Sequence, residues 1–358
     1  MWLTSLLLRA LVESPVRAFR SLGKGAIFFG TDIGLRREEN QDRVAVVRWQ
    51  RESDNGKGPT TAVIVSDGMG GLQDGATCAA LAVATFAAKL IDGRHGPIDE
   101  VVNDAARAAN DAVYSAYRGK GGATLSAVIV SPNGAGLGVN VGDSRVYAPL
   151  RNHPERKVLR LTTDDTMKEA FGSEGDGLLQ FIGVGSGLKP HLFEVDPIHL
   201  VVITTDGAHF VEPKMFAEII ARSPDPKAIV ERTVALSRWL GAPDNATVAA
   251  IDIQRVQSSS DPNLAEGAEI WTGGSEGPIY ALFSRSTSDR QPQRHMAVSE
   301  SEPRKQTNQA RIEPDVVPAP KSTSKHKRKK KASSSSPAAE QLTIDVEVTK
   351  DSRSDADR

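Results

Sequence analysis

The sequence predicts an α+β fold, a four-layer α-β-β-α sandwich in which two antiparallel β-sheets are flanked by helix pairs, followed by a disordered C-terminal tail. Segments with strand character follow one another in runs rather than alternating strictly with helices, which favours antiparallel sheets over a doubly wound parallel sheet. The helical segments come in two pairs. After residue 254 the chain becomes rich in Ser, Pro, Gln and charged residues, as in chains that cannot bury enough apolar surface to fold.

The expected strands are short β-branched or apolar runs bounded by Gly, Asn, Asp or Pro. They lie at residues 44–49, 61–66, 126–131, 136–141, 146–150, 200–205 and 247–253. The expected helices have apolar residues at spacings of three and four, and several are rich in Ala. They lie at residues 75–91, 98–117, 213–221 and 226–240. Two helix pairs on the outside of two sheets account for all of these segments.

We expect three regions along the chain of 358 residues. Residues 1–25 form an N-terminal segment, 26–254 a single domain, and 255–358 a largely disordered tail with a basic run at 325–331. Within the tail, the stretch 268–283 contains segments apolar enough to dock on the domain or on a partner. The basic run is either a solvated charge run or a contact for acidic protein, phospholipid or nucleic acid.

The N-terminal segment starts with a short apolar run, residues 2–12, that Arg9 interrupts. The run is too short to span a bilayer and lacks the charge order and cleavage site of a signal peptide. Because Arg9, Arg17, Arg20 and Lys24 lie close by, one interpretation is an amphipathic segment in contact with an anionic membrane. The alternatives are a helix packed on the domain and a stretch that precedes the true start codon.

The charge balance and the cysteine content narrow the class of protein. The formal net charge is −1, so nucleic acid is not expected as a partner of the 26–254 domain. Cys78 is the single cysteine, which excludes an intrachain disulfide and a Cys-rich zinc site and is compatible with a reducing compartment. Its Ala-rich surroundings favour a small buried apolar residue over a nucleophile.

Aspartates recur at the ends of apolar strands, followed by glycine or a tight turn. Asp67, Asp143 and Asp206 end three predicted strands, and Asp42 and Asp244 border two others. Strand ends on a rigid scaffold can bring carboxylates into one site, and the adjacent glycines let backbone approach a ligand closely. Each Asp-Gly pair alone is equally well explained by a turn. Their joint occurrence points to a shared site.

Several carboxylates in one pocket repel one another and become protonated unless a cation offsets their charge. A cluster of hard oxygen ligands without matching His or Cys suits Mg²⁺ or Mn²⁺ rather than zinc. The sequence therefore predicts a site for divalent cations.

A set of motifs spread over residues 26–254 resembles the PPM, or type 2C, metal-dependent serine/threonine phosphatases, in particular their bacterial members. The resemblance does not reach the tail. The motifs occur in the family's order: Thr31-Asp32-Ile33-Gly34 with Arg37 and Asn40-Gln41-Asp42, Asp67-Gly68-Met69-Gly70-Gly71, Gly122-Ala123-Thr124, Val141-Gly142-Asp143-Ser144-Arg145, Leu161-Thr162-Thr163-Asp164, Thr205-Asp206-Gly207, and Asp244-Asn245-Ala246-Thr247.

The resemblance implies how these residues would hold two Mn²⁺ or Mg²⁺ ions. Asp67 bridges both ions. The Gly68 carbonyl and Asp42 complete the protein ligands of one ion, and Asp206 and Asp244 complete those of the other. Water fills the remaining positions, as Mg²⁺ in particular prefers.

Two further roles follow from the same resemblance. Asp143, together with Asp206, borders a weaker third metal ion. Arg37 holds the substrate phosphate, for which the fork of a guanidinium is well suited. Asn245 is expected to hold its loop rather than to bind metal.

The reaction implied by the resemblance is hydrolysis of phosphoserine and phosphothreonine in proteins. A hydroxide that bridges the two metals attacks phosphorus, and no phosphoenzyme forms. The implied partners are phosphorylated proteins and a cognate serine/threonine kinase whose action is reversed. The expected location is the cytoplasm, either free or peripheral to the inner face of the membrane.

The sequence departs from the family pattern at several positions. Gln41 stands where many relatives carry a glutamate ligand, so we place the ligand on Asp42. Met69 stands where eukaryotic members have a histidine proposed as general acid. His209 is either a replacement for that acid or a structural hydrogen-bonding residue. The glycine-rich segment 167–190 matches the flap beside the active site, anchored through residues 178–183.

Two other functions compete with an active protein phosphatase. One is a catalytically silent member of the fold that serves as a regulatory binding module; the presence of all the expected ligand positions argues against it. The other is a metal-dependent hydrolase of small phosphate esters, which requires a closed, shape-selective pocket.

Overall fold

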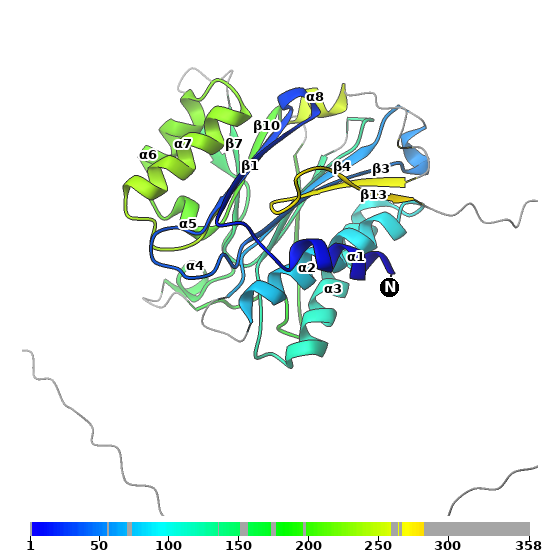
Figure 1. Ribbon diagram of the computed structural model, residues 1–358, viewed down its shortest axis with the longest axis horizontal. Helices are drawn as coiled ribbons and strands as arrows, with labels where there is room; N and C mark the ends of the chain where they lie inside the picture. Colours follow the sequence, from blue (N-terminus) through cyan, green and yellow to red (C-terminus); the bar gives the residue numbers. More distant parts are fainter. Residues whose placement is uncertain are drawn as a thin grey trace, which may run out of the picture. The chain divides into compact units, whose positions relative to one another are not determined.

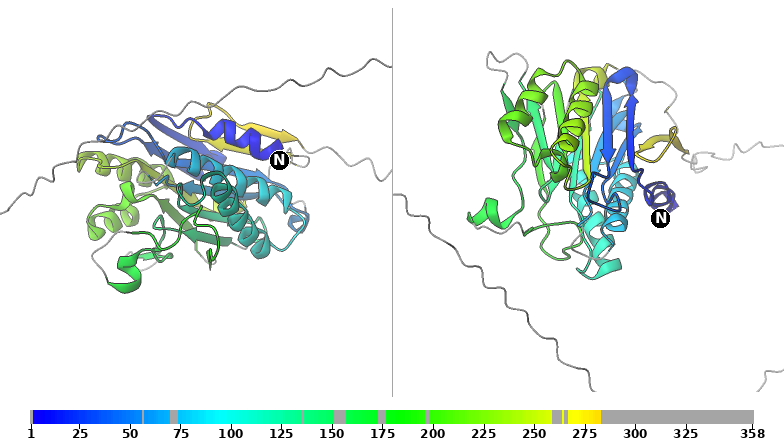
Figure 2. Two further views of the ribbon diagram at one scale, coloured as in Figure 1. Left: turned by 90° about the horizontal axis from the view of Figure 1, so that it is seen from below. Right: turned by 60° about the vertical axis from the view of Figure 1, so that its left-hand side comes forward.

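Two antiparallel β-sheets lie face to face, and helices cover their outer faces (Figures 1 and 2). This computed structural model describes residues 2–282, except 56, 70–73, 135, 151–156, 173–176, 196–197, 259–263 and 265–266. The α+β sandwich predicted from the sequence is confirmed. The basic run at 325–331, and with it the predicted disorder of the tail beyond residue 282, lies outside the described residues.

The first sheet contains six strands in the described part of the chain, each antiparallel to its neighbours. In spatial order they are β1 (Arg17–Leu22), β2 (Ile27–Asp32), β11 (Ala246–Asp252), β10 (Leu200–Thr204), β7 (Arg145–Pro149) and β8 (Val158–Arg160).

The second sheet contains seven strands among the described residues, again all antiparallel. In spatial order they are β13 (Ile279–Leu282), β12 (Gly267–Thr272), β3 (Arg43–Trp49), β4 (Thr60–Ser66), β5 (Leu125–Val130), β6 (Gly136–Val141) and β9 (His191–Glu194).

Helices form the two outer layers. The second sheet is covered by α1 (Trp2–Leu11), α2 (Gly75–Asp92) and α3 (Ile98–Tyr117), and the first by α5 (Asp206–His209), α6 (Pro213–Arg222) and α7 (Pro226–Trp239). The short helices α4 (Met167–Phe171) and α8 (Ile253–Gln257) lie in connections. In α6 and α7 a proline opens the first turn, and the preceding Glu212 or Asp225 caps it by accepting a backbone N–H.

Side-chain alternation along each strand separates the core into layers. In β3, Ala45 and Val47 face the helices, whereas Val44 and Val46 face the other sheet. This is the period of two expected for a strand that is buried on both faces. Both sheets are therefore fixed in register, and so are the strand ends that carry the aspartates.

The N-terminal segment belongs to the sandwich. In α1, Leu3, Leu7 and Leu11 are buried against the core that α2 contributes to, and β1 pairs along its whole length with β2. For the apolar face of α1, the structure therefore confirms the alternative of a helix packed on the domain.

The chain also returns to the second sheet after residue 254. The β12–β13 hairpin adds to the edge of β3 through pairs such as Ile270 with Val47, so the apolar stretch at 268–283 docks on the domain. The compact unit runs from Met1 to Arg290, wider than the predicted 26–254 domain. In these added elements the apolar pattern is short and irregular, so the sequence did not indicate that they pair with distant strands.

Helix α2 is long and apolar enough to cross a membrane by composition alone. It is instead a core helix, because 78% of its apolar window is buried inside the structure. Its many buried alanines let α3 approach it closely.

Candidate active site

Asp42 and Asp67 meet at one end of the second sheet. Asp42 immediately precedes β3, and Asp67 immediately follows β4. Because Arg43 pairs with Ser66 at the end of the antiparallel ladder, the two aspartates are neighbours. This proximity was predicted from the Asn-Gln-Asp and Asp-Gly motifs.

The other three aspartates come from the first sheet and from the crossover between sheets. Asp206 follows β10 and starts α5, and Asp244 lies just before β11, which pairs antiparallel with β10. Asp143 lies in the turn between β6 of the second sheet and β7 of the first. The same end of the sandwich thus receives all five predicted ligand aspartates.

Burial and the neighbouring aspartates raise the pKa of the Asp67 carboxyl group. Burial raises its pKa, and the charges of Asp42, Asp206 and Asp143 raise it further. Burial also raises the pKa of Asp206, and the charge of Asp244 raises it further. Repulsion of this kind is what a bound cation relieves.

Asp42 is fully buried. Its Oδ2 atom accepts a hydrogen bond of 2.9 Å from the Thr205 hydroxyl, while its Oδ1 atom is buried without a donor among the described residues. Burial raises the pKa of Asp42 to about 7, with added contributions from the charges of Asp206 and Asp244. Thr205 was not singled out from the sequence, although it precedes Asp206 in a recognised motif.

The predicted Gly122-Ala123-Thr124 motif holds the backbone of Asp67. The Asp67 N–H donates to the Thr124 hydroxyl at 2.9 Å, and the Thr124 N–H donates to the Asp67 carbonyl at 2.8 Å. The next residue, Gly68, lies against the start of α2, where a Cβ atom would be 2.3 Å from the Gly75 carbonyl oxygen. Only glycine fits there. Gly70 and Gly71 of the same motif lie outside the described residues.

Arg37 and Asp244 form an ion pair at the edge of the site. The Arg37 Nη2 atom lies 2.5 Å from Asp244 Oδ2, and 43% of the Arg37 side chain is exposed. This hydrogen bond raises the pKa of Arg37, and the charges of Asp206 and Asp67 act in the same direction. Arg37 therefore lies beside the acidic residues, and its role in binding the substrate phosphate stays a prediction.

Asn245 ties together the loops on either side of this ion pair. Its Oδ1 atom accepts the Gln41 N–H at 2.8 Å. Its Nδ2 atom donates to the carbonyls of Ile33 and Glu39 at 2.9 and 3.0 Å. The predicted role of Asn245 as a loop-holding residue is confirmed.

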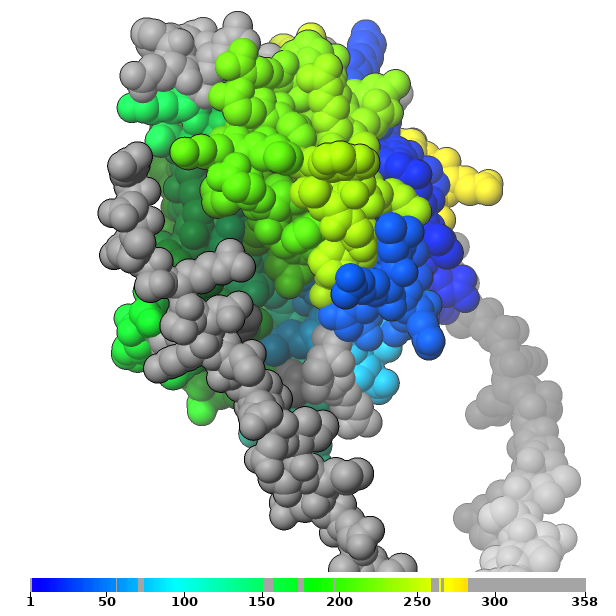
Figure 3. Space-filling view, turned by 90° about the vertical axis from the view of Figure 1, so that its left-hand side faces the viewer, coloured from blue at the N-terminus to red at the C-terminus, as the bar shows by residue number. Residues whose placement is uncertain are grey.

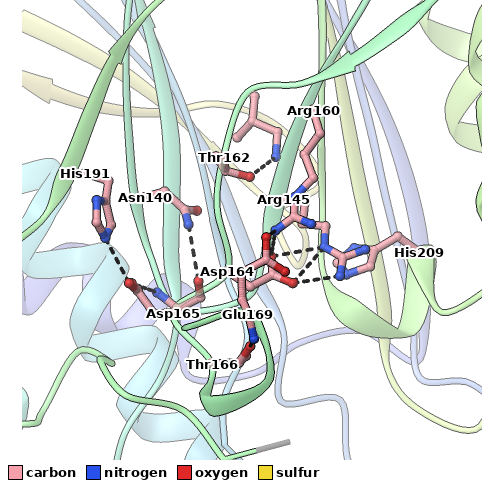
Figure 4. Close-up of polar contacts among 12 residues, drawn as sticks. Asn140, Arg145, Arg160, Thr162, Asp164, Asp165, Thr166, Glu169, His191 and His209 are labelled. Atoms are coloured by element: carbon pink, nitrogen blue, oxygen red, sulfur yellow. Dashed lines mark hydrogen bonds and ion pairs between the residues drawn. The ribbon is translucent and has the colours of Figure 1, made fainter. Parts of the chain in front are cut away.

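A second polar network, centred on Asp165 (Figure 4), holds Gly142, the residue before Asp143. The N–H of Gly142 donates to Asp165 Oδ2 at 2.9 Å, and the Asp165 N–H donates back to the Gly142 carbonyl at 3.0 Å. The Oδ1 atom of Asp165 lies 2.9 Å from His191 Nε2. Burial raises the pKa of Asp143 to about 6, and the charge of Asp206 adds to the shift. The sequence did not predict this role for Asp165.

Arg145 and Arg160 are held by Asp164 beside this network (Figure 4). Arg145 makes a two-pronged contact, with Nη2 at 2.7 Å and Nε at 3.1 Å from Asp164 Oδ2. Arg160 Nη2 lies 2.6 Å from the other oxygen. The carboxylate thus pairs with two guanidinium groups and connects β7 to β8, so Asp164 of the Leu-Thr-Thr-Asp motif has a structural role.

The flap segment is anchored where the sequence predicted. Ile182 is fully buried and exchanges two backbone hydrogen bonds with Ala123, at 2.8 and 3.1 Å. Leu179 donates its N–H to the Asp165 carbonyl at 2.7 Å, and the Gln180 side chain donates to Asp165 Oδ1 at 3.0 Å. Residues 173–176 of this segment lie outside the described residues.

His209 and Cys78 fill structural positions. His209 is buried, its Nδ1 atom lies 2.8 Å from the Thr204 hydroxyl, and burial lowers its pKa well below the usual range. The ring is therefore neutral near pH 7 and suits hydrogen bonding better than proton donation. Cys78 is buried in α2, and burial raises the pKa of its thiol to about 11, which keeps it protonated.

The donor set at this end of the sandwich suits hard divalent cations. The Oδ1 atoms of Asp42 and Asp206 are both buried without a donor among the described residues, and oxygen is the donor that Mg²⁺ and Mn²⁺ prefer. In the described positions, no three His, Cys, Asp or Glu side chains converge into a metal-binding cluster. At Asp244, the Oδ2 atom accepts a hydrogen bond from Arg37.

Comparisons with solved structures identify the fold. MsPP from Mycobacterium smegmatis, described as a PPM Ser-Thr phosphatase in complex with cacodylate, is 27% identical, covers 63% of this chain and 97% of its own, and gives a TM-score of 0.50. The catalytic domain of the serine/threonine protein phosphatase PstP, in complex with two manganese ions, is 24% identical over 66% of this chain and 98% of its own, with a TM-score of 0.51. The serine/threonine phosphatase Stp1 from Staphylococcus aureus is 18% identical over 63% and 94%, with a TM-score of 0.52.

This chain has the PPM phosphatase fold. The resemblance predicted from the sequence motifs is therefore confirmed at the level of structure. Scans of the sequence against protein-family models and against curated proteins found no match. Near the two ends of the described chain, α1 packs on the second sheet and the β12–β13 hairpin adds to its edge.

Proposed function

We propose that this protein hydrolyses phosphoserine and phosphothreonine in proteins with two, or three, Mn²⁺ or Mg²⁺ ions held by its strand-end aspartates. The observation that carries this proposal is the placement of five buried or half-buried aspartates, together with Arg37, at one end of a PPM fold. The similar PstP domain, which is described with two manganese ions, gives the cation its chemical precedent.

The arrangement of the aspartates supports the ligand set implied by the sequence resemblance. The charges of Asp42, Asp206 and Asp143 all act on Asp67, so Asp67 would be the ligand shared between ions. Asp42 and the Gly68 carbonyl would complete one ion's protein ligands, and Asp206 and Asp244 the other's. Asp143 would serve a third ion.

Bound divalent cations would supply an acidified water as the nucleophile and would offset the charge that develops on the phosphate. The chain's own residues supply the positioning. Arg37, half-exposed at the rim, would exchange its contact with Asp244 Oδ2 for the phosphate oxygens, to which its planar fork can donate two parallel hydrogen bonds. Thr205 and Thr124 hold the Asp42 and Asp67 groups in place.

In this proposal, no side chain donates the proton to the leaving serine or threonine oxygen. Met69 cannot supply a proton, and His209 is buried and neutral at the pH of interest. Solvent water at the site would therefore provide it.

The proposal includes partners and a location. The substrates are phosphorylated proteins, and the reaction would reverse a cognate serine/threonine kinase in the cytoplasm. Contact with the inner face of a membrane would involve the exposed Trp2, Val12 and Val16 rather than the leucine face of α1, which is buried.

A phosphopeptide release assay tests the proposal. Wild-type protein is expected to release phosphate from a phosphothreonine peptide with Mn²⁺ and to lose this activity in EDTA. Asp67→Asn is expected to retain less than about 1% of the rate, since it removes the shared ligand. Asp252→Asn, at the opposite end of β11 and capping α8, is the matched control and should behave as wild type, because Asn also caps helices well.

The competing functions give different results in the same assay. A silent binding module would release no phosphate from any ester in the presence of metal. A hydrolase of small phosphate esters would act on an aryl phosphate but not on the peptide. Absence of metal-dependent phosphate release from the peptide would overturn the proposal.

A further inference from the structure

Three large apolar side chains are exposed close in the chain to Arg37 and Asp244: Leu35 lies in the loop of Arg37, and Trp239 and Leu240 lie at the C-terminal end of α7, just before the loop of Asp244. Leu35 is 56% exposed, Trp239 78% and Leu240 40%. We call these three residues the apolar patch. Isolated exposed apolar residues are common, but a group of them rimmed by polar residues is typical of a contact surface.

The fold does not require tryptophan at position 239. Helix α7 buries Ile229, Val230 and Val234 against the first sheet. Trp239 lies nine residues after Val230, about two and a half helical turns, and so projects from the opposite side of the helix. Its large apolar surface therefore contributes little to the core.

The apolar patch is fixed in place next to the candidate active site. The Leu35 N–H donates to the Ala242 carbonyl at 3.0 Å. Gly34 has a φ of +84°, and a Cβ atom there would be 2.4 Å from the Asp244 carbonyl oxygen, so the two loops are in direct contact. In Figure 3 the blue segment around residues 33–41 lies against the yellow-green segment that follows α7.

We propose that the apolar patch binds the substrate polypeptide beside its phosphorylated residue, so that preferred substrates carry a large apolar side chain close to the phosphoserine or phosphothreonine. The inference rests on the proposed function, because Arg37 is assigned there to the phosphate. Leu35 is two residues from Arg37, and two residues span at most about 7 Å. A peptide whose phosphate lies at Arg37 must pass this surface within a few residues if it leaves on the side of these loops.

Tryptophan is the residue type that contributes most often to binding hot spots. Trp239 also offers a rigid apolar surface that loses little conformational entropy on binding. A small phosphate ester would not reach it. The apolar patch should therefore affect peptide substrates without affecting the chemistry at the metal site.

A set of matched peptides tests this inference. Phosphothreonine peptides of equal length, built from Gly and Ser, carry a single Leu at each position from four residues before to four residues after the phosphothreonine. A peptide without Leu and a small aryl phosphate serve as reference substrates. Wild type is compared with Trp239→Ala and Leu35→Ala, and with Tyr280→Ala, a control that removes a 61% exposed aromatic side chain on β13.

Wild type is expected to prefer peptides with Leu at one or two of these positions. Trp239→Ala and Leu35→Ala should lower kcat/KM for those peptides by about 5- to 30-fold, through KM, the range expected for loss of a binding hot spot. Neither should change the rate with the aryl phosphate or the Leu-free peptide, and Tyr280→Ala should change none of them.

Three outcomes overturn the inference. The first is a wild-type kcat/KM that does not depend on the position of Leu in the peptide. The second is a loss of kcat/KM in Tyr280→Ala equal to that in Trp239→Ala. The third is a wild-type dimer in sedimentation that Trp239→Ala dissociates, which would make the apolar patch a self-association surface. Failure of the proposed function looks different, because wild type with Mn²⁺ would then leave every peptide intact, whether or not it cleaved the aryl phosphate.

Discussion

Arg37 combines an exposed position with a charge that acts on several site aspartates. Exposed ion pairs contribute only about 0–1 kcal/mol, so Arg37→Ala should change the free energy of unfolding by no more than about 0.5 kcal/mol. A hydrogen bond to a charged group contributes about 1.5–3 kcal/mol. We therefore expect kcat/KM for a phosphopeptide to fall by about 10- to 100-fold, mainly through KM.

Arg37→Lys separates charge from geometry in the same kinetic assay. Lysine keeps the positive charge but lacks the planar fork, so an intermediate loss is expected. An unchanged KM in Arg37→Ala would contradict the assignment of this residue to the phosphate.

Asn245 acts on the site through backbone groups rather than through the substrate. It is buried, and Asn245→Ala removes three hydrogen bonds to the loops beside Asp42 and Asp244. Unsatisfied buried groups cost about 1–3 kcal/mol, so the melting temperature should fall by about 5–10 °C. Calorimetry should also show weaker Mn²⁺ binding.

The control is Asn133→Ala, which removes one exposed side-chain bond to the Ser53 carbonyl. Its melting temperature should match wild type. Equal melting temperatures for both variants would mean that Asn245 does not hold these loops.

The sequence predicted the site aspartates because each follows or precedes a strand with a strong apolar pattern. It did not predict Thr205 as a ligand-holding residue or Asp165 as the support of Gly142. A threonine or aspartate in a loop has many possible partners, and the choice depends on which strand lies opposite. That information comes from the pairing of the sheets, not from local residue type.

The same distinction applies to whole elements. Strands such as β3, β4 and β10 are buried on both faces, so their sequences are apolar runs that indicate strands directly. The edge strands β1 and β13 alternate exposed and buried residues over only a few positions. Their strand character depends on pairing with β2 and β12, and a local pattern does not predict it.

Helix α1 provides a test of the wider domain boundary. Leu7 is fully buried, whereas Trp2 on the same helix is 58% exposed. Leu7→Ala should lower the free energy of unfolding by about 2–5 kcal/mol, the cost of a cavity in a packed core. Trp2→Ala should change it by less than about 0.5 kcal/mol. Urea unfolding of both variants measures this difference, and equal stabilities would place α1 outside the cooperative unit.

Across the molecule, the fold gathers carboxylates from both sheets at a cost in stability. Each sheet contributes strand ends, so the closing of the sandwich itself brings Asp42 and Asp67 toward Asp206 and Asp244. Ionised and without a cation, these groups repel one another in a buried setting. The folded state should therefore favour either protons or divalent cations at this end.

This coupling predicts an unusual dependence of stability on pH. Burial raises the pKa of Asp42 to about 7 and that of Asp143 to about 6, whereas the unfolded chain releases these protons near pH 4. Between about pH 4 and pH 7 the folded state thus binds more protons than the unfolded state, so this contribution to stability is lost as the pH rises. One pKa unit corresponds to about 1.4 kcal/mol, and the metal-free protein should melt about 5–10 °C lower at pH 8 than at pH 5.5.

Divalent cations should reverse this loss, because they bind the ionised carboxylates that repel one another at pH 8. Excess Mn²⁺ is expected to raise the melting temperature at pH 8 and to have little effect at pH 5.5, where protons compete for the same oxygens. Asp42→Asn should melt higher than wild type in EDTA at pH 8, depend less on pH and gain less from Mn²⁺, since its side chain carries no charge. Scanning calorimetry of wild type and this variant, with EDTA or Mn²⁺ at both pH values, measures all three effects. A metal-free wild type that is more stable at pH 8 than Asp42→Asn would show that the aspartates are stabilised by the protein itself and need no cation.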